Sequence, residues 1–217
     1  MTSISTVKIR WERRKDARPQ ELLSAALDLF VKSGYAGTRL EDVAKRAGVS
    51  KGTLYLYFSS KEELFKAVVR ENILPMIGEA EQVFAQYQGS SIDLFRYFIL
   101  GWWERIGDTK LSGIGKLMMS EAGNFPEIAR FYHAEIITRS TAMITNLLDR
   151  GIASGEFRKV DTFQTAQLIK APMMMMMLWQ HFYSACQIEP IPPKEYLENF
   201  IDIYLRGLLN DPKNHTH

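Results

Sequence analysis

Apolar residues recur at helical spacing along the first third of the chain. After Pro19, which suits the first turn of a helix, Leu23, Leu27 and Phe30 fall on one face. Gly34 follows directly, and glycine readily adopts the left-handed conformation in which helices end. The pattern therefore predicts a first helix between Pro19 and Gly34.

Three short helices with tight connections are expected next. Leu40 and Val43 lie on one face of the second helix, for which Thr38 is a plausible N-cap. Ser50 and Ser60 are placed to cap the third and the fourth helix. The second and third helices are separated only by Ala-Gly-Val-Ser, which indicates a helix-turn-helix arrangement.

The remainder of the chain also has helical periodicity and no convincing strand pattern. Pro75 is expected to kink or end the fourth helix. Further helices are predicted at about 91–107, 111–123, 126–154, 161–186 and 193–209. With about nine helices in all, the sequence predicts an all-α fold, in which a three-helix N-terminal unit precedes a larger helical domain.

The most specific pattern in the sequence is GVSKGTLYLYFSSKEEL at residues 48–64. Over about residues 19–66 the chain closely resembles the DNA-binding domain of TetR-family transcriptional regulators. The run SEAGNFPE at residues 120–127 resembles the AefR-like subgroup of that family. The resemblance and the helix pattern together imply a flexible basic arm at 1–16, a helix-turn-helix DNA-binding domain at 17–66, a helical ligand-binding and dimerisation domain at 67–210, and a tail at 211–217.

A recognition helix must be short, anchored by few apolar residues and polar outside. Leu54 and Phe58 can dock it on the preceding helices, so that Lys51 and Tyr57 project toward base edges in the major groove. By these criteria and by the resemblance, the expected DNA-binding residues are Thr38, Arg39, Ser50, Lys51, Gly52, Thr53, Tyr55, Leu56, Tyr57 and Lys61. Two alternatives stay open: Leu56 can contact a base or only pack, and an isolated lysine is often a solvated surface charge.

The net charge of +2 is unevenly distributed along the chain. Residues 1–70 hold 14 Lys and Arg against 8 Asp and Glu, whereas residues 71–217 have a net charge of −4. A basic N-terminal third is typical of a polyanion-binding unit. The basic residues within 8–18 are expected either to contact the DNA backbone or minor groove, or to serve only as a solubilising tail.

Helix-turn-helix proteins bind paired half-sites as dimers, so a homodimer is expected. The resemblance implies that the last two long helices form a four-helix bundle with the partner subunit. In the second of them, the expected dimer interface is an apolar stripe that consists of Leu197, Phe200, Ile201, Tyr204 and Leu208. The alternative is that this stripe faces only its own domain.

Five consecutive methionines, Met173 to Met177, cover every side of one helix, which must therefore be buried on all sides. Flexible methionines suit a pocket for varied apolar ligands, and plain core filling is the alternative. A Cu(I) site is disfavoured because adjacent methionines on a helix diverge. Together with nearby aromatic residues, the expected ligand-binding residues are Trp102, Trp103, Met118, Met119, Phe131, Met174, Trp179 and Phe182.

The sequence argues against several other classes of protein. The motifs of serine hydrolases, zinc proteases, dithiol redox proteins and phosphate-binding loops are absent, so no catalytic residue, cofactor or metal is expected. The longest apolar run, Ala171 to Trp179, is too short to cross a membrane. A single cysteine, Cys186, is typical of a reducing compartment, here the cytoplasm.

These observations predict a homodimeric repressor that a small apolar or aromatic ligand releases from a pseudo-palindromic operator in double-stranded DNA. The ligand would act by favouring a conformer whose recognition helices no longer match the spacing of the major groove. The alternative is a DNA-binding regulator that is ligand-independent or that activates transcription.

Overall fold

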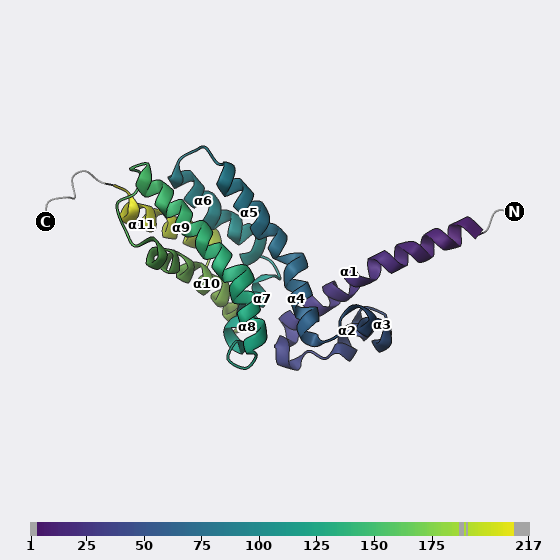
Figure 1. Cartoon of the computed structure of the whole chain (residues 1–217). Coiled ribbons are helices and arrows are strands. Elements are labelled where there is room, and N and C mark those ends of the chain that lie inside the picture. Colours follow the sequence, from purple (N-terminus) through teal and green to yellow (C-terminus); the bar gives the residue numbers. More distant parts are fainter. Residues whose placement is uncertain (1–3, 187–188, 190, 211–217) are drawn as a thin grey trace. The chain divides into compact units, whose positions relative to one another are not determined.

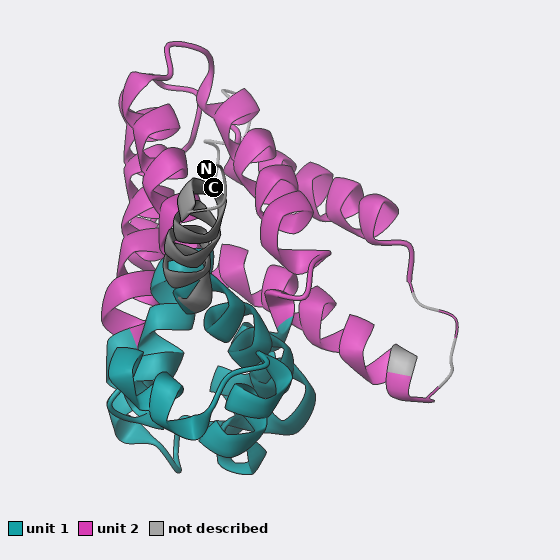
Figure 2. Ribbon diagram, turned by 90° about the vertical axis from the view of Figure 1, so that its right-hand side faces the viewer, with its two compact units in different colours: residues 1–72, 113–131 teal, residues 73–112, 132–217 magenta. Residues whose placement is uncertain are grey.

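The computed structural model describes residues 4–186, 189 and 191–210, which are helical apart from their connections and one isolated β-bridge (Figure 1). The all-α fold class is therefore confirmed. The chain forms two compact units (Figure 2). Unit 1 combines residues 1–72 with 113–131, and unit 2 combines residues 73–112 with 132–217.

Unit 1 contains the helix-turn-helix region. Its helices are α1 (Ile4–Gly37), α2 (Leu40–Arg46), α3 (Lys51–Tyr57), α4 (Lys61–Asn72), most of α7 (Ser112–Glu121) and most of α8 (Pro126–Tyr132). The core is built around Phe30 and Phe65, which are fully buried and meet edge to face with ring centroids 5.3 Å apart. Leu22, Leu54 and Leu64 are also fully buried in this unit.

The first helix differs from the prediction at its start. Residues 4–16 continue α1 as a helix, where a flexible arm was expected. The expectation relied on missing apolar periodicity, but Lys, Arg and Glu favour helices without any apolar face. The predicted end is confirmed, because Gly34 has a φ of +72° and interrupts the helical geometry.

Local sequence signals set the next boundaries. Ser50 Oγ accepts a hydrogen bond from Thr53 N, and Ser60 Oγ accepts one from Glu63 N, so both predicted caps are present. The N-cap of α2 is Arg39, whose side chain makes no capping bond, and not Thr38. Thr38 instead donates its hydroxyl back to Gly34 O, which removes it from a capping position.

Unit 2 is a bundle of longer helices. They are α5 (Leu74–Gln86), α6 (Ser91–Trp102), α9 (Thr138–Ala153), α10 (Thr162–Cys186) and α11 (Pro193–Leu208), with π-helical turns η1 (Trp103–Gly107) after α6 and η2 (His133–Ile137) before α9. Pro75 falls in the first turn of α5, so the fourth helix ends at Asn72 as predicted. The helix α5 itself was missing from the predicted segments.

The two units do not follow the expected boundary near residue 67. Residues 113–131 lie within the expected ligand-binding domain but pack with the N-terminal helices in unit 1. A sequence boundary assumes a contiguous domain, whereas this chain enters unit 2, returns to unit 1 and leaves it again. The predicted tail at 211–217 lies outside the described residues, and no helix of the described chain is long and apolar enough to span a membrane.

Candidate nucleic-acid interface and pocket

The helix α3 has the geometry expected of a recognition helix. Leu54 is its one buried residue and is fully enclosed, so a single side chain anchors the helix on its neighbours. Tyr55 and Tyr57 are exposed, and Leu56 exposes 83% of its surface. A protein rarely leaves three large apolar or aromatic side chains of one short helix in water without a partner for that face.

The predicted base-contacting lysine has an intramolecular partner. Lys51 at the start of α3 forms an ion pair with Glu41 of α2, and its Nζ lies 5.8 Å from the centroid of the Tyr55 ring. The hydrogen bond to Glu41 raises the pKa of Lys51, and the same bond lowers the pKa of Glu41. Both side chains are about half exposed, so DNA can replace the carboxylate at little cost.

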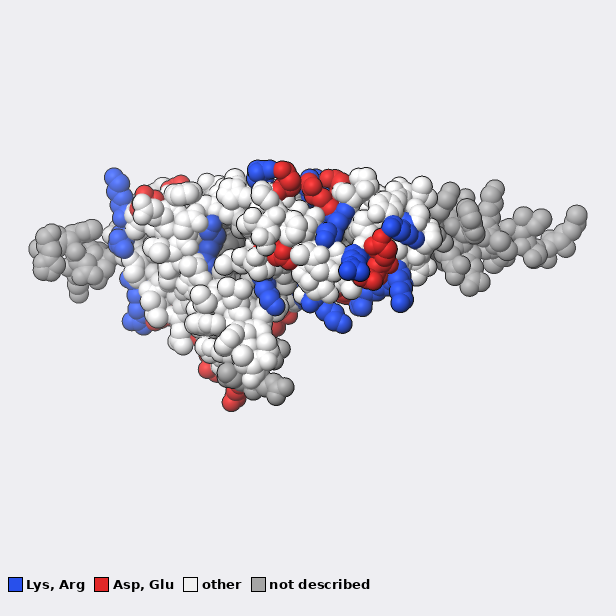
Figure 3. All heavy atoms as spheres, turned by 90° about the horizontal axis from the view of Figure 1, so that it is seen from below, with Lys and Arg blue, Asp and Glu red and all other residues white. Residues whose placement is uncertain are grey.

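Half of the other predicted DNA-binding residues are exposed to solvent. Arg39, Ser50 and Gly52 are exposed, and Thr53 is half-buried. Figure 3 shows several Lys and Arg side chains gathered on one face, with acidic side chains among them. Residues 1–18 alone carry six Lys and Arg against two Asp and Glu, so much of the predicted positive charge comes from the start of α1.

Two predicted DNA-binding residues donate hydrogen bonds to backbone oxygens within unit 1. Thr38 is 3% exposed, and its hydroxyl donates to Gly34 O at 2.7 Å. Lys61 Nζ donates to the carbonyl oxygens of Tyr35, Ala36 and Thr38 at 2.8, 3.3 and 3.2 Å. Burial lowers the pKa of Lys61. A phosphate contact by Lys61 would therefore compete with three backbone acceptors.

The expected dimer stripe on α11 is largely core. Leu197 and Ile201 are fully buried, Phe200 and Leu208 are 6% and 4% exposed, and only Tyr204 is half-buried. The four buried side chains cannot form a contact surface for a second subunit, because their own domain already covers them. The helical periodicity identified the buried face of α11, and that face belongs to the core.

A different apolar surface lies on α10 and α11. Leu168, Met175 and Phe182 of α10 expose 60%, 44% and 56% of their surfaces, and they recur at seven-residue spacing. Ile203 of α11 is 68% exposed. The two helices are joined by a hydrogen bond from the Tyr204 hydroxyl to Leu168 O. Because a seven-residue repeat aligns side chains along one helix face, these residues form a stripe.

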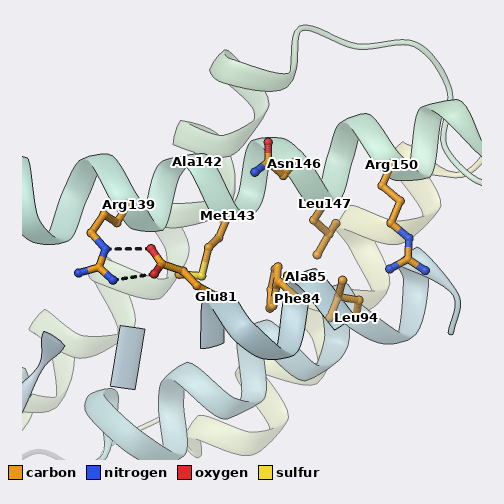
Figure 4. Close-up of a pocket in the computed structure, with 10 residues that line it drawn as sticks. All are labelled: Glu81, Phe84, Ala85, Leu94, Arg139, Ala142, Met143, Asn146, Leu147 and Arg150. Atoms are coloured by element: carbon orange, nitrogen blue, oxygen red, sulfur yellow. Dashed lines mark hydrogen bonds and ion pairs between the residues drawn. The ribbon is translucent and has the colours of Figure 1, made fainter. Parts of the chain in front are cut away.

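Unit 2 contains a pocket of about 330 Å³ between α5, α6 and α9 (Figure 4). Its lining consists of Glu81, Phe84, Ala85, Leu94, Arg139, Ala142, Met143, Asn146, Leu147 and Arg150. Arg139 donates two hydrogen bonds to the Glu81 carboxylate, at 2.8 and 2.6 Å. These bonds lower the pKa of Glu81.

The second arginine lies at the opposite end of the lining helix (Figure 4). Arg150 donates to Tyr87 O at 2.9 Å and to Gly89 O, so it holds the connection between α5 and α6. Phe84, Leu94 and Leu147 provide apolar surface between the two arginines. The arrangement suits an apolar molecule, with charged groups available at both ends of the pocket.

None of the eight predicted ligand-binding residues lines this pocket. Met118, Met119 and Phe131 belong to unit 1, and the other five belong to unit 2. Trp103 and Met118 are buried, Met119 and Phe182 are exposed, and the remaining four are half-buried. The predicted cluster is therefore divided between the two units.

Comparison with protein families identifies two regions of the chain. Residues 22–68 match the model described as bacterial regulatory proteins, tetR family. Residues 103–206 match the model described as AefR-like transcriptional repressor, C-terminal domain. The first region contains α2 and α3, and the second contains the pocket-lining helix α9.

Individual transcriptional regulators match this chain as well, some over a short region and others over most of its length. The chain is 52% identical over 59 residues to the HTH-type transcriptional regulator RutR of Escherichia coli, a match of 27% of this chain and only 28% of that relative's length. It is 25% identical over 190 residues to the HTH-type transcriptional repressor KstR2 of Rhodococcus jostii, covering 87% of this chain and 91% of the relative. The solved structure of FadR from Bacillus subtilis in complex with stearoyl-CoA has a TM-score of 0.70 at 18% identity, over 87% of this chain and 98% of that one, and shows a shared fold.

Proposed function

Because the chain belongs to the TetR family of DNA-binding transcriptional regulators, we propose that it is a homodimeric repressor, released from a pseudo-palindromic operator by a small apolar or aromatic ligand. It is a regulator and not an enzyme. The observation that carries the proposal is the recognition helix α3, which a single buried leucine anchors and which leaves its outer face exposed. Such a regulator would work in the cytoplasm, where its DNA is.

Repression is supported by the nature of the matched relatives. The model matching residues 103–206 is named for a transcriptional repressor, and KstR2, which aligns over most of the chain, is also named as a repressor. A protein bound over an operator represses by occupying DNA that transcription requires. A regulator that activates transcription is distinguished by its effect on a reporter gene.

The homodimer is supported by the exposed stripe on α10 and α11. Leu168, Met175 and Phe182 expose large apolar side chains along one face of α10, and Ile203 exposes another on α11. A second copy of the same stripe is a self-complementary partner for it, as two-fold symmetry requires. The dimer would bring two recognition helices to successive major grooves.

A ligand is supported by the pocket in unit 2. Its volume of about 330 Å³ falls in the range of small-molecule sites, and its lining is largely apolar. The B. subtilis FadR structure, which shares the fold, contains stearoyl-CoA, a molecule with a long apolar chain. An apolar or aromatic effector is the ligand class that this pocket supports.

The DNA-binding part is tested with duplexes selected by the protein from a randomised pool. We expect a pseudo-palindromic consensus, and binding that weakens steeply as the salt concentration rises. A reporter gene with the selected duplex in its promoter should be repressed by the protein. Failure to enrich any sequence would contradict the proposal. Reporter expression that increases when the protein is present would identify the protein as an activator.

The ligand-binding part is tested by filling the pocket. Ala142 lines the pocket on α9, so Ala142→Trp should abolish release from the selected duplex by a panel of apolar and aromatic compounds. Ala153 is exposed at the end of the same helix and outside the lining, so Ala153→Trp is the matched control. If no compound releases the unchanged protein, the regulator is ligand-independent.

A further inference from the structure

Side chains from distant parts of the chain contact the backbone at residues 34–39, where α1 ends and α2 has not yet begun. The left-handed Gly34 interrupts α1, and the chain continues through Tyr35 and Ala36 to Thr38 before α2 begins at Leu40. The ends of helices leave carbonyl and amide groups that take partners from outside the helix, either side chains or water. In this connection, side chains from distant parts of the chain supply them.

The carbonyl groups accept hydrogen bonds from Lys61 at the start of α4. Its ammonium group donates to Tyr35 O, Ala36 O and Thr38 O, and it lies 4.6 Å from the centroid of the Tyr35 ring. A lysine has three N–H donors, and all three have an acceptor here. The ammonium therefore holds the connection together from one side.

An amide group of the same connection donates a hydrogen bond to Glu121 at the end of α7. Its Oε1 accepts a hydrogen bond from Ala36 N at 3.2 Å. A Cβ atom added to Gly34 would lie 2.8 Å from the same oxygen, so the carboxylate passes close over the backbone. The positive φ of Gly34 favours glycine at this position.

Apolar contacts hold the segment 113–131 against the same helices. The Phe125 ring lies 4.6 Å from the Tyr35 ring, centroid to centroid, in an edge-to-face arrangement. The Arg70 guanidinium of α4 lies 5.0 Å from the centroid of the Phe131 ring. At the start of α7, a Cβ on Gly113 would lie 2.5 Å from Val31 of α1. The segment is therefore packed on α1 and α4 at its beginning and at its end.

We propose that Glu121 is a positioning residue for DNA binding: together with Lys61 it holds the α1–α2 connection, and thereby the start of α2, in the conformation that binds the operator. Arg39 and the exposed face of α3 follow this connection in the chain. Glu121 lies outside the helix-turn-helix and its carboxylate would repel phosphate, so it acts through Ala36 and not by touching DNA. The inference rests on DNA binding by the family and is independent of any effector.

The test compares four variants on the duplex selected by the unchanged protein. Glu121→Ala should weaken binding to that duplex by about five-fold or more, a typical size for coupling between sites. Glu121→Gln keeps an oxygen that can accept from Ala36 N and should restore most of the affinity. Glu121→Asp keeps the charge on a shorter side chain, so it should weaken binding, and it serves in place of Glu121→Ala if that variant does not fold. Glu127→Ala is the control, because Glu127 is exposed in the same segment and its ion pair, within the described residues, is with Arg130 in the next turn of its helix.

Three further measurements separate positioning from general stability and from direct DNA contact. Hydrogen exchange of the Ala36 amide should accelerate in Glu121→Ala while the melting temperature changes little, and the slope of log affinity against log salt concentration should stay constant. Unchanged affinity in Glu121→Ala would overturn the proposal, as would an equal loss in Glu127→Ala or a loss that Gln does not restore. A failure of the effector hypothesis is distinguishable, because it leaves operator binding by the unchanged protein intact.

Discussion

The helices α3 and α11 are both rich in apolar side chains but use them in opposite ways. In α3 a single leucine, Leu54, is buried, and the three large side chains that follow it in the sequence face water. In α11 the buried residues are Leu197, Phe200, Ile201, Leu205 and Leu208. Ile203 of the same helix is exposed. The first helix is held weakly to present a surface, and the second is held strongly to complete a core.

This difference shows what a hydrophobic pattern can establish. Regular spacing along α11 identified a face that is removed from water, but the same spacing serves a domain core and a subunit interface equally well. In α3 the apolar residues are consecutive and have no such regularity, so their role followed from the family motif. An exposed apolar residue beside a regular stripe is therefore better evidence for a partner than the stripe itself.

The largest expected effect separates the two faces of α11. Ile201→Ala should lower the free energy of unfolding by about 2–5 kcal/mol, because it creates a cavity in the core. The loss should be the same at every protein concentration. Chemical denaturation over a range of concentrations measures it, and a loss that disappears in dilute protein would place Ile201 in an interface instead.

On α3, a substitution of an exposed residue should change DNA affinity and leave folding stability unchanged. Lys51→Ala should cost about 1–3 kcal/mol of operator affinity at one base position in each half-site, if the lysine reads a base after leaving Glu41. Competition between duplexes that differ at single positions measures this preference. A uniform loss across all duplexes, with a smaller dependence on salt, would make Lys51 a phosphate contact.

Ile203→Ala is the partner experiment to Ile201→Ala on the same helix. The substitution removes an exposed side chain, so stability of the separate subunit should change by less than about 0.5 kcal/mol. Dimer association should weaken by about 1–2 kcal/mol, the transfer free energy of the removed methyl and methylene groups. Sedimentation of dilute protein gives the dissociation constant, and an unaltered constant would remove Ile203 from the proposed interface.

The smallest expected effect concerns Leu56. Leu56→Ala should leave the free energy of unfolding within about 0.5 kcal/mol, because 83% of the side chain is in water. It should reduce operator affinity by about 1 kcal/mol or less and relax the preference for one thymine, whose methyl group an apolar side chain can contact. Equal binding to thymine and uracil duplexes by the unchanged protein would argue that Leu56 reads no methyl group.

The fold was predictable from the sequence where its signals are local. Ser50, Ser60 and Pro75 set helix boundaries through groups a few residues away, and the structure places those boundaries as expected. Residues 4–16 were misjudged, because a helix of charged residues has propensity but no apolar period. Local patterns thus define the elements but not every extension of them.

The candidate site was less predictable where it depends on residues far apart in the chain. Ala36 and Glu121 are 85 positions apart, so their hydrogen bond leaves no spacing signal in the sequence. The run SEAGNFPE was recognisable as a family pattern, but its contacts with Tyr35 and Ala36 required the structure. For the same reason, the roles of Thr38 and Lys61 inside unit 1 were not apparent from the motif that contains them.

The return of residues 113–131 to unit 1 has a consequence for engineering this family. Hybrid regulators are made by joining the DNA-reading end of one protein to the sensing end of another at a single splice point. A splice after residue 72 of this chain would separate Tyr35 from Phe125 and Ala36 from Glu121. A hybrid that keeps its parent's operator preference would therefore need two grafted segments, residues 1–72 and residues 113–131, and three junctions instead of one.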